Sequence, residues 1–141
     1  MTNELQLPGN YRPSADEPYM NERQLEYFRR KLLAWREELL AEAQSTIDAM
    51  REAPTDGADE ADRASRESDT SFELRTRDRY RKLLNKIESA LKRIADGSYG
   101  YCDETGEEIG LGRLEARPIA TLTVEAQERR ERRQSLQADP H

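Results

Sequence analysis

The sequence is short of the residues on which most enzymes and disulfide-stabilised proteins depend. Its 141 residues include one cysteine and one histidine, and the histidine is the last residue of the chain. A single cysteine forms no internal disulfide. The lone thiol has no base beside it in the sequence, and no glycine-rich phosphate loop appears. We therefore expect a protein that is not an enzyme and has no catalytic residues.

Long apolar segments and blocks of one charge are also missing. No apolar run approaches the roughly 18 residues of a membrane span, and the first residues lack the basic and apolar regions of a signal peptide. The net charge is −6, with acidic and basic residues interleaved along most of the length. Because DNA binding needs a concentrated basic face, we expect no direct, sequence-specific DNA contact. The sequence predicts a cytoplasmic protein without a membrane partner.

Apolar side chains are scarce: hydrophobic residues make up 35% and aromatic residues 6%, against 37% charged residues. A chain with this composition cannot surround all of its helices with one thick core. Two long helices that bury only a narrow seam fit it better. We therefore predict a mainly α fold, a long antiparallel coiled-coil hairpin with a small C-terminal lobe and a C-terminal helix.

The first arm of the hairpin is predicted to follow an extended segment over residues 1–20. That segment is rich in proline and would dock through Leu5, Leu7, Tyr11 and Tyr19. Asn21 has the character of a helix N-cap, and Gln24 completes a capping-box pattern. Spacings of three and four residues then predict a helix of about 30 residues. Its seam consists of Leu25, Phe28, Leu32, Trp35, Leu39, Ala43, Ile47 and Met50.

The hairpin, residues 21–96, is interrupted by an acidic turn over residues 54–64. Pro54 and Gly57 disfavour regular helix, so the chain must reverse there. A second helix is expected to begin between Asp59 and Ala64 and to end before Gly97, which suits a left-handed C-terminal position. The apolar stripe of this helix consists of Phe72, Thr76, Tyr80, Leu83, Ile87, Leu91 and Ile94.

The C-terminal lobe is predicted to span residues 97–141. Its start is rich in turn residues, and the alternation of Ile109 and Leu111 within residues 107–114 suggests short strands. A charged helix is expected from about Val124 to Leu136. The lobe core is predicted to consist of Tyr99, Tyr101, Ile109, Leu111, Leu114, Ile119 and Leu122.

Two pairs of positions in this lobe have the spacing of a four-ligand zinc finger: 102 and 105, then 123 and 126. The residues there are Cys102, Thr105, Thr123 and Ala126. Only Cys102 supplies a thiolate, threonine is a poor zinc ligand, and alanine cannot bind a metal. We therefore expect no zinc, and we interpret Cys102 as a small buried side chain.

The motifs of the lobe resemble the C-terminal finger of the DksA/TraR family. They are the segment 97–106, Gly-Ser-Tyr-Gly-Tyr-Cys-Asp-Glu-Thr-Gly, and Arg-Leu-Glu-Ala-Arg-Pro at 113–118. Upstream, Tyr-Met-Asn-Glu at 19–22, Asp59-x-x-Asp62-Arg-Ala64 and residues 73–79 resemble the same family. The resemblance covers residues 18–133. It departs from the family at three of the four cysteines.

This resemblance implies a function that composition does not reveal. Members of the family bind RNA polymerase and insert the hairpin tip through its secondary channel, where they destabilise open promoter complexes. With guanosine tetraphosphate (ppGpp) they act in the stringent response, repressing ribosomal RNA promoters and activating amino-acid biosynthesis promoters. The matching tip residues are Asp59, Asp62 and Ala64. The positions that match the nucleotide site are Lys86 and Arg117, while Gln127 replaces a lysine of the family.

Two alternatives remain open from the sequence. Transcript-cleavage factors of the Gre type share the long hairpin and use an acidic tip to hold Mg²⁺ for RNA cleavage. A plain coiled-coil adaptor would instead dimerise through its seam. An antiparallel hairpin formed within one chain satisfies its own seam, so we expect a monomer.

Overall fold

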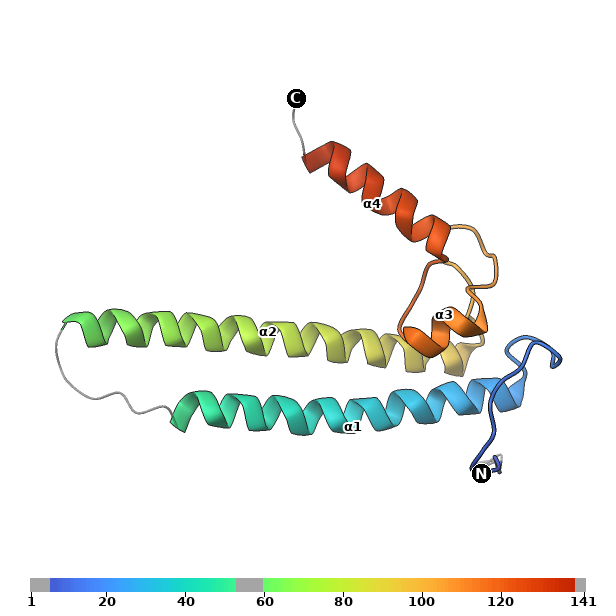
Figure 1. Cartoon of the computed structure of the whole chain (residues 1–141), viewed down its shortest axis with the longest axis horizontal. Helices are drawn as coiled ribbons and strands as arrows, with labels where there is room; N and C mark the ends of the chain where they lie inside the picture. The colour runs from blue at the N-terminus through green and yellow to red at the C-terminus, as the bar shows by residue number, and fades with distance from the viewer. Residues whose placement is uncertain (1–5, 53–59, 139–141) are drawn as a thin grey trace. The chain divides into compact units, whose positions relative to one another are not determined.

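The computed structural model describes residues 6–52 and 60–138. Over these residues the chain forms α1 (Glu22–Glu52), α2 (Glu60–Asp96), α3 (Leu111–Ala116) and α4 (Val124–Ala138) (Figure 1). The mainly helical prediction is confirmed. The chain divides into two compact units. One is residues 33–88, and the other joins the chain up to Leu32 with the chain from Ser89 onward.

The start of α1 follows the predicted capping pattern with one difference. The backbone N–H of Gln24 donates to Asn21 Oδ1 at 2.8 Å, which makes Asn21 the cap. In a standard capping box the Gln24 side chain would accept from Asn21, but its Oε1 accepts from the N–H of Met20 at 2.8 Å. The fully buried Gln24 amide also donates to the carbonyl of Ser14. One side chain thus fixes both the helix start and the segment before it.

In the unit of residues 33–88, α1 and α2 run antiparallel. Contacts between the helices join Arg36 to Glu88 at 2.8 Å, Thr46 to Tyr80 at 3.3 Å and Arg51 to Glu73 at 2.9 Å. The sequence separation of these pairs falls from 52 to 34 to 22 residues, as it must on approach to a turn. The predicted hairpin is confirmed, and its buried seam includes Leu39, Ile47, Thr76 and Ile87.

The seam does not continue as far along α2 as predicted. Phe72 falls on the apolar stripe, but 54% of it is exposed. The physical reason is that the apolar stripe of α1 ends at Met50, which is itself only half-buried. A large side chain of α2 beyond that point has little apolar surface to pack against.

In the other unit, α2 ends as predicted. Gly97 has a φ of 84°, and the N–H groups of Ser98 and Tyr99 both donate to the carbonyl of Arg93. The expectation of short strands over residues 107–114 is wrong. The described residues contain one isolated bridge, between Tyr101 and Glu108, and Leu111 begins helix α3. Two alternating apolar residues are too few to specify a strand, and Gly110, with a φ of 101°, redirects the chain.

The core of this lobe is partly as predicted. Tyr99, Ile109, Leu114 and Leu122 are buried, and Leu111 and Ile119 are half-buried. Tyr101 is 38% exposed, so its assignment to the core is wrong. Its ring packs edge-on against Tyr19, with ring centres 5.5 Å apart.

The N-terminal segment docks on the lobe through Tyr19, as the sequence predicts. The Tyr19 hydroxyl donates to the carbonyl of Gly100 at 2.7 Å and accepts from the N–H of Gly110 at 2.9 Å. One phenol therefore joins two turns of the lobe. Leu5, also predicted to dock, lies outside the described residues.

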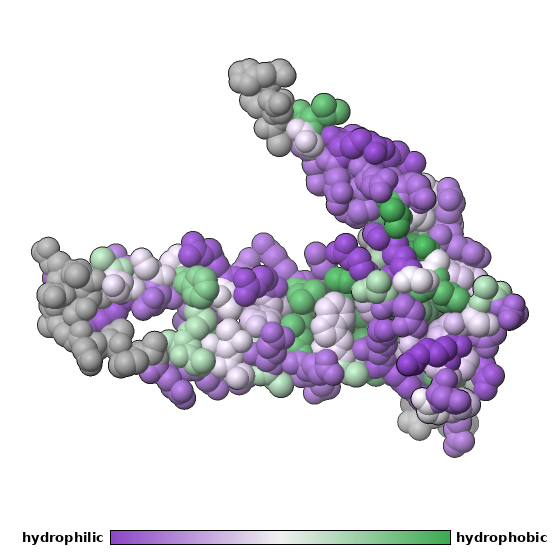
Figure 2. Space-filling model, viewed as in Figure 1, coloured by the Kyte–Doolittle hydropathy of each residue, from purple (hydrophilic) through white to green (hydrophobic). Residues whose placement is uncertain are grey.

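Helix α4 has a mainly hydrophilic surface (Figure 2). Its charged side chains are exposed, whereas Ala126 in the first turn is fully buried. Over the residues that the structure describes, no helix is long and apolar enough to cross a bilayer.

Candidate functional site

The acidic turn is only partly within the described residues. Asp59 lies outside them, Asp62 belongs to the first turn of α2, and Ala64 is exposed one position beyond that turn. The helix therefore begins where the sequence predicts. Carboxylates in a first helical turn complement the partial positive charge of the helix N-terminus. The functional role of Asp59, Asp62 and Ala64 stays a prediction.

One exposed face of α2 carries a row of cations that sequence reasoning did not single out. We call Arg75, Arg79, Lys82 and Lys86 the basic ladder; all four are exposed. Their spacings of four, three and four residues place them on one helical stripe about 16 Å long. Ala64, Ser68 and Ser71 continue the same stripe toward the turn, so no carboxylate interrupts it. The signal was present in the sequence as the regular spacing of the cations.

The four side chains of the basic ladder differ in their contacts. Lys82 pairs with Asp78 at 2.9 Å, and the guanidinium of Arg79 lies 5.8 Å from the centre of the Tyr80 ring. Arg75 and Lys86 form no hydrogen bond or ion pair with other described residues. These two are therefore available for an anionic partner.

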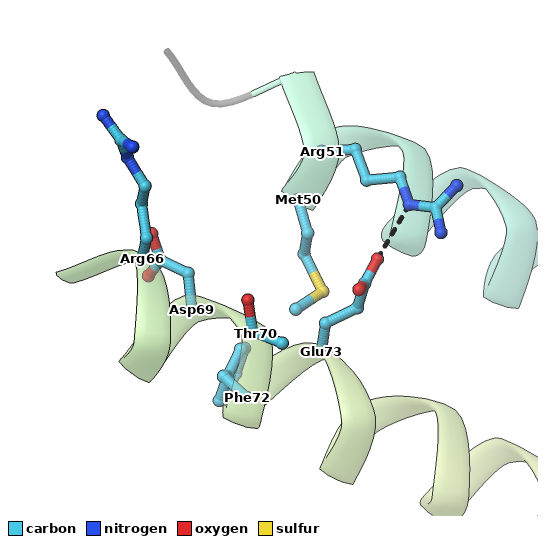
Figure 3. A pocket seen from close by; sticks show the side chains of 7 residues that line it. All are labelled: Met50, Arg51, Arg66, Asp69, Thr70, Phe72 and Glu73. Atoms are coloured by element: carbon cyan, nitrogen blue, oxygen red, sulfur yellow. Dashed lines mark hydrogen bonds and ion pairs between the residues drawn. The ribbon is translucent and has the colours of Figure 1, made fainter. Parts of the chain in front are cut away.

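A hollow of about 360 Å³ lies between α1 and α2 at the end of the hairpin nearest the turn (Figure 3). Met50 and Phe72 line it, and Arg51, joined to Glu73 at 2.9 Å, lies on its wall. The hollow results from the early end of the seam. It leaves apolar surface exposed in the same stretch of the hairpin as Ala64.

The two predicted nucleotide-binding cations occupy different units of the chain. Lys86 is exposed on α2, and Arg117 is exposed at the C-cap of α3. Neither side chain forms a hydrogen bond or ion pair with another described residue. Gln127 is half-buried in α4 and donates to Glu131 at 3.0 Å. A joint role of Lys86 and Arg117 stays a prediction.

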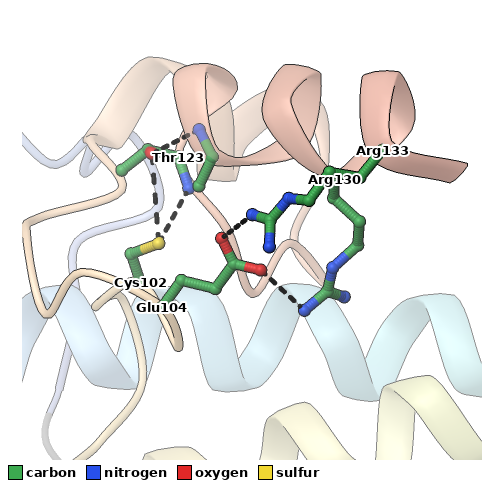
Figure 4. A network of polar contacts seen from close by, with 6 residues as sticks. Cys102, Glu104, Thr123, Arg130 and Arg133 are labelled. Carbon is green, nitrogen blue, oxygen red and sulfur yellow. Dashed lines mark hydrogen bonds and ion pairs between the residues drawn. The ribbon is translucent and has the colours of Figure 1, made fainter. Parts of the chain in front are cut away.

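The four zinc-finger positions show how this lobe is arranged with a single cysteine (Figure 4). Cys102 Sγ accepts from the N–H of Thr123 at 3.4 Å and lies 3.9 Å from its hydroxyl. Thr123 Oγ1 also accepts from the N–H of Ala126 at 3.2 Å, so Thr123 is the N-cap of α4. Thr105 is exposed, and its hydroxyl accepts from the N–H of Glu107.

This donor set does not fit a zinc ion. A structural zinc site needs four donors, mainly thiolate and imidazole. Here one thiol is present, Ala126 has no donor, and the Thr123 oxygen is already used as a helix cap. Within the described part of the chain, no group of three or more His, Cys, Asp or Glu side chains could hold a metal.

The environment of Cys102 changes its acidity. Burial by itself raises the pKa of the thiol, but hydrogen-bond donors more than offset it. They are the Thr105 hydroxyl and the backbone N–H groups of Thr123, Thr105 and Glu104, and together they lower the pKa to about 7. These donors therefore favour the thiolate form of Cys102.

A second polar contact ties α4 to the segment after Cys102 (Figure 4). Glu104 pairs with Arg130 at 3.1 Å and with Arg133 at 3.7 Å. The two arginines are three positions apart and share one face of α4. The sequence predicts a charged helix here but does not indicate which carboxylate its arginines contact.

A two-helix hairpin, a basic ladder and a small finger-like lobe are features of a protein that acts by binding a partner. Two family models match the chain: "DnaK suppressor protein DksA, N-terminal domain" over residues 24–94, and "Prokaryotic dksA/traR C4-type zinc finger" over residues 97–132. The chain belongs to the DksA family. The resemblance found in the sequence is therefore confirmed.

Relatives support this assignment along most of the chain. A protein of Caulobacter vibrioides named RNA polymerase-binding transcription factor DksA is 62% identical over 130 residues, covering 92% of each chain. The protein of that name from Escherichia coli K12 is 48% identical over 115 residues, covering 82% of this chain and 76% of its own. Both are named as transcription factors, which agrees with the expectation of a non-enzymatic protein.

A solved structure confirms the fold. Transcription factor DksA2 from Pseudomonas aeruginosa superposes with a TM-score of 0.73 at 49% sequence identity, and the match covers 87% of this chain and 93% of that one.

Proposed function

We propose that this protein binds RNA polymerase and regulates transcription by inserting its hairpin into the secondary channel. The observation that carries the proposal is the family membership, at 62% identity to a protein named as an RNA polymerase-binding transcription factor. The hairpin supports it physically, because a pair of helices is narrow enough to enter a channel that excludes globular domains. No chemistry by the protein itself is required.

At the working end, the carboxylates of Asp59 and Asp62 act on the active centre of the polymerase. Charges act over short distances where water is partly excluded, and a catalytic Mg²⁺ or a basic loop is a suitable target. The protein destabilises open promoter complexes by contacting two polymerase conformations differently, which is sufficient to shift their populations.

The basic ladder and the hollow extend the proposed contact surface along the hairpin. Arg75 offers an exposed cation that pairs with no other described residue, which suits an acidic wall of the channel. The exposed Phe72 offers apolar area beside the hollow. The basic ladder guides the hairpin into the channel and fixes its position there, while the tip destabilises the open complex.

ppGpp is the proposed co-effector, held by Lys86 and Arg117 against the polymerase rim. Cationic donors suit a polyphosphate, and arginine can bind it with two parallel hydrogen bonds. Through this nucleotide the protein takes part in the stringent response, repressing ribosomal RNA promoters and activating amino-acid biosynthesis promoters. Gln127 lacks the charge of the family lysine, so the nucleotide enhances the effect less than in members that retain it.

The proposed activity is independent of zinc, and it serves the cell when zinc is scarce or thiols are being oxidised. The support for zinc independence is the Thr123 cap, which orders the start of α4 without a metal. A genetic test is complementation of a strain lacking the four-cysteine protein. Rescue confined to zinc-poor or oxidising medium is expected, and equal rescue in all media would contradict the proposed role.

The decisive experiment is transcription in vitro from a ribosomal promoter, with and without ppGpp. We expect Asp62→Asn to abolish repression while polymerase affinity stays within about twofold, since a tip that acts on the active centre adds little to anchoring. Asp16→Asn, at an exposed aspartate of the N-terminal segment, makes the same charge change outside the hairpin and should keep full activity. A matched loss of binding in Asp62→Asn would make the tip an anchor.

Two alternatives give different outcomes in the same assay. Cleavage of RNA in a backtracked polymerase complex would identify a Gre-type factor with a metal-binding tip. A dimer in sedimentation, without polymerase binding, would identify a coiled-coil adaptor. The proposed function requires a monomer that shortens open-complex lifetime without cleavage.

A further inference from the structure

Helix α3 has six residues and leads directly into Arg117. A helix this short is not stable by itself, because too few hydrogen bonds offset the cost of forming its first turn. It begins after Gly110, which has no side chain to cap it. The orientation of α3 therefore depends on contacts with neighbouring elements, and so does the direction in which Arg117 leaves the helix.

Hydrogen bonds fix the main chain around Arg117 within the lobe. The N–H of Arg117 donates to the carbonyl of Arg113 at 2.7 Å, and its carbonyl accepts from the N–H of Ala120 at 3.0 Å. The carbonyl of the next residue, Pro118, accepts from the buried Tyr99 hydroxyl at 2.7 Å. Because the exposed guanidinium of Arg117 extends from a fixed backbone, it reaches a limited region, and the position of α3 decides where that region lies.

Glu115 joins α3 to α1. Its carboxylate pairs with Lys31 at 2.7 Å and accepts a hydrogen bond from the Tyr27 hydroxyl, and both partners belong to α1. The guanidinium of Arg12, in the N-terminal segment, acts on the same carboxylate. All four residues lie in the unit that contains the lobe. Three segments of the chain therefore meet at one half-buried carboxylate.

These contacts favour the charged form of Glu115. Burial raises the pKa of the carboxyl group, but the hydrogen bonds from Lys31 and Tyr27, with the nearby charge of Arg12, more than offset it and lower the pKa. The side chains of Glu115 and Lys31 are each 35% exposed, and an ion pair of this kind adds little to stability. Its main effect is on geometry, because a charge-assisted hydrogen bond to α1 restricts the orientation of the short helix.

We propose that Glu115 is a positioning residue, which orients α3 so that Arg117 meets the polyphosphate of the nucleotide. It acts through its contacts with Lys31 and Tyr27 of α1. The inference rests on the proposed ppGpp site, and it adds to that site a residue that does not touch the ligand.

Reversing the charge of Glu115 separates positioning from simple electrostatics. Glu115→Lys adds positive charge two positions from Arg117, and this charge by itself would strengthen the binding of an anionic ligand. The same change places two lysines together and removes the contact between α3 and α1. Loss of positioning therefore predicts weaker nucleotide binding in spite of the added charge.

The test is the ppGpp concentration that gives half of the maximal nucleotide effect on open-complex lifetime. We expect Glu115→Lys to raise this concentration about fivefold or more, while the effect of the protein without nucleotide stays unchanged. The exchanged pair, Lys31→Glu with Glu115→Lys, rebuilds the contact with reversed charges and should return the concentration to within about twofold of that of the natural sequence. Glu22→Lys, at an exposed position of α1, makes the same charge change and should have no effect.

Three outcomes overturn the positioning role. A lower concentration for Glu115→Lys would show that charge alone governs the site. Failure of the exchanged pair to restore the response would show that the contact with Lys31 does not orient α3. An equal rise in Glu22→Lys, or loss of the nucleotide-free effect in Glu115→Lys, would indicate a general change in charge or folding.

Arg117→Ala, measured in the same assay, distinguishes failure of this inference from failure of the proposed nucleotide site. If Arg117→Ala raises the ppGpp concentration and Glu115→Lys does not, only the positioning role is wrong. If Arg117→Ala leaves the concentration unchanged, the proposed nucleotide site is itself wrong, and the positioning role falls with it.

Discussion

At the scale of single residues, Gly100 has the least room for a side chain among the glycines that the structure describes. Its φ is 94°, and an added Cβ would lie 2.8 Å from Met20 Cγ and 2.9 Å from Met20 Sδ. A left-handed backbone costs a residue with a side chain about 1–2 kcal/mol, and overpacking adds about 1–3 kcal/mol. We expect Gly100→Ala to lower the free energy of unfolding by about 2–5 kcal/mol, as measured by urea denaturation.

Gly106 supplies the matched control for this prediction. Its φ is also positive, at 75°, but an added Cβ would meet nothing within 4 Å. Gly106→Ala should therefore lose only the conformational part, about 1–2 kcal/mol. Equal losses in the two variants would show that the packing of Met20 against Gly100 contributes little.

Cys102 makes the stability of the lobe dependent on pH. The pKa of its thiol is about 7 in the folded protein, below its ordinary value of 9.0, because of the surrounding donors. A group whose folded pKa is lowered stabilises the fold above its unfolded pKa, and this contribution is lost as the pH falls through the folded value. The free energy of unfolding should therefore rise between pH 7 and pH 9.

Cys102→Ser removes the titrating thiol and nearly preserves its size, so it is the control. Thermal unfolding of both proteins at several pH values across this range gives the difference between their free energies of unfolding. The other titrating groups are the same in both proteins, so their contributions cancel in this difference. Parallel curves for the two proteins would contradict a lowered pKa of Cys102.

At the scale of helices and loops, local patterns predict the long helices well. The Asn21 cap, the spacing of Phe28, Leu32 and Leu39, and the Gly97 terminus are all readable from nearby residues, and the structure confirms each. Helix α3 and the exposure of Tyr101 were missed. Both lie beside the contacts of Tyr19 with Gly100 and Gly110, which are 81 and 91 positions away and leave no periodic signal.

The candidate site likewise has some features that the sequence shows and others that only the structure shows. The zinc-finger spacing and the loss of three cysteines are visible in the sequence, and so is the spacing of the basic ladder. The double role of Thr123, as cap of α4 and donor to Cys102, requires knowledge of where the helix starts in space. The pairing of Glu104 with Arg130 likewise joins residues 26 positions apart.

The basic ladder leads to a prediction about polymerase affinity. Arg75→Glu reverses an exposed charge on α2 that pairs with no other described residue, and we expect it to weaken polymerase binding by about tenfold at low salt. The effect should shrink at high salt, because salt screens exposed charges beyond about 10 Å at 0.1 M. Fluorescence anisotropy at two salt concentrations measures it.

Lys92→Glu is the control for charge reversal. Lys92 is also exposed on α2 but lies about a quarter-turn or more away from the ladder. An equal loss of affinity in Lys92→Glu would indicate that net charge, rather than the ladder, governs binding.

At the scale of the whole molecule, several weak interactions stabilise the lobe. Other members of the family are expected to hold a metal ion there. Tyr19 joins two turns, Thr123 caps α4, and Glu104 holds Arg130 and Arg133. A cap contributes about 1 kcal/mol, and a partly exposed ion pair contributes less than about 1 kcal/mol. The lobe should therefore be stable without metal but only moderately so.

Chelation tests this account. Because Thr105, Thr123 and Ala126 cannot ligate zinc, a strong chelator should leave the melting temperature of the protein unchanged. The triple variant Thr105→Cys, Thr123→Cys and Ala126→Cys restores four thiolates at finger spacing. It should bind one zinc ion by elemental analysis and become sensitive to chelation, since metal-binding free energy then enters folding. A lower melting temperature of the natural sequence on chelation would show that a metal supports this lobe and that the Thr123 cap is not sufficient.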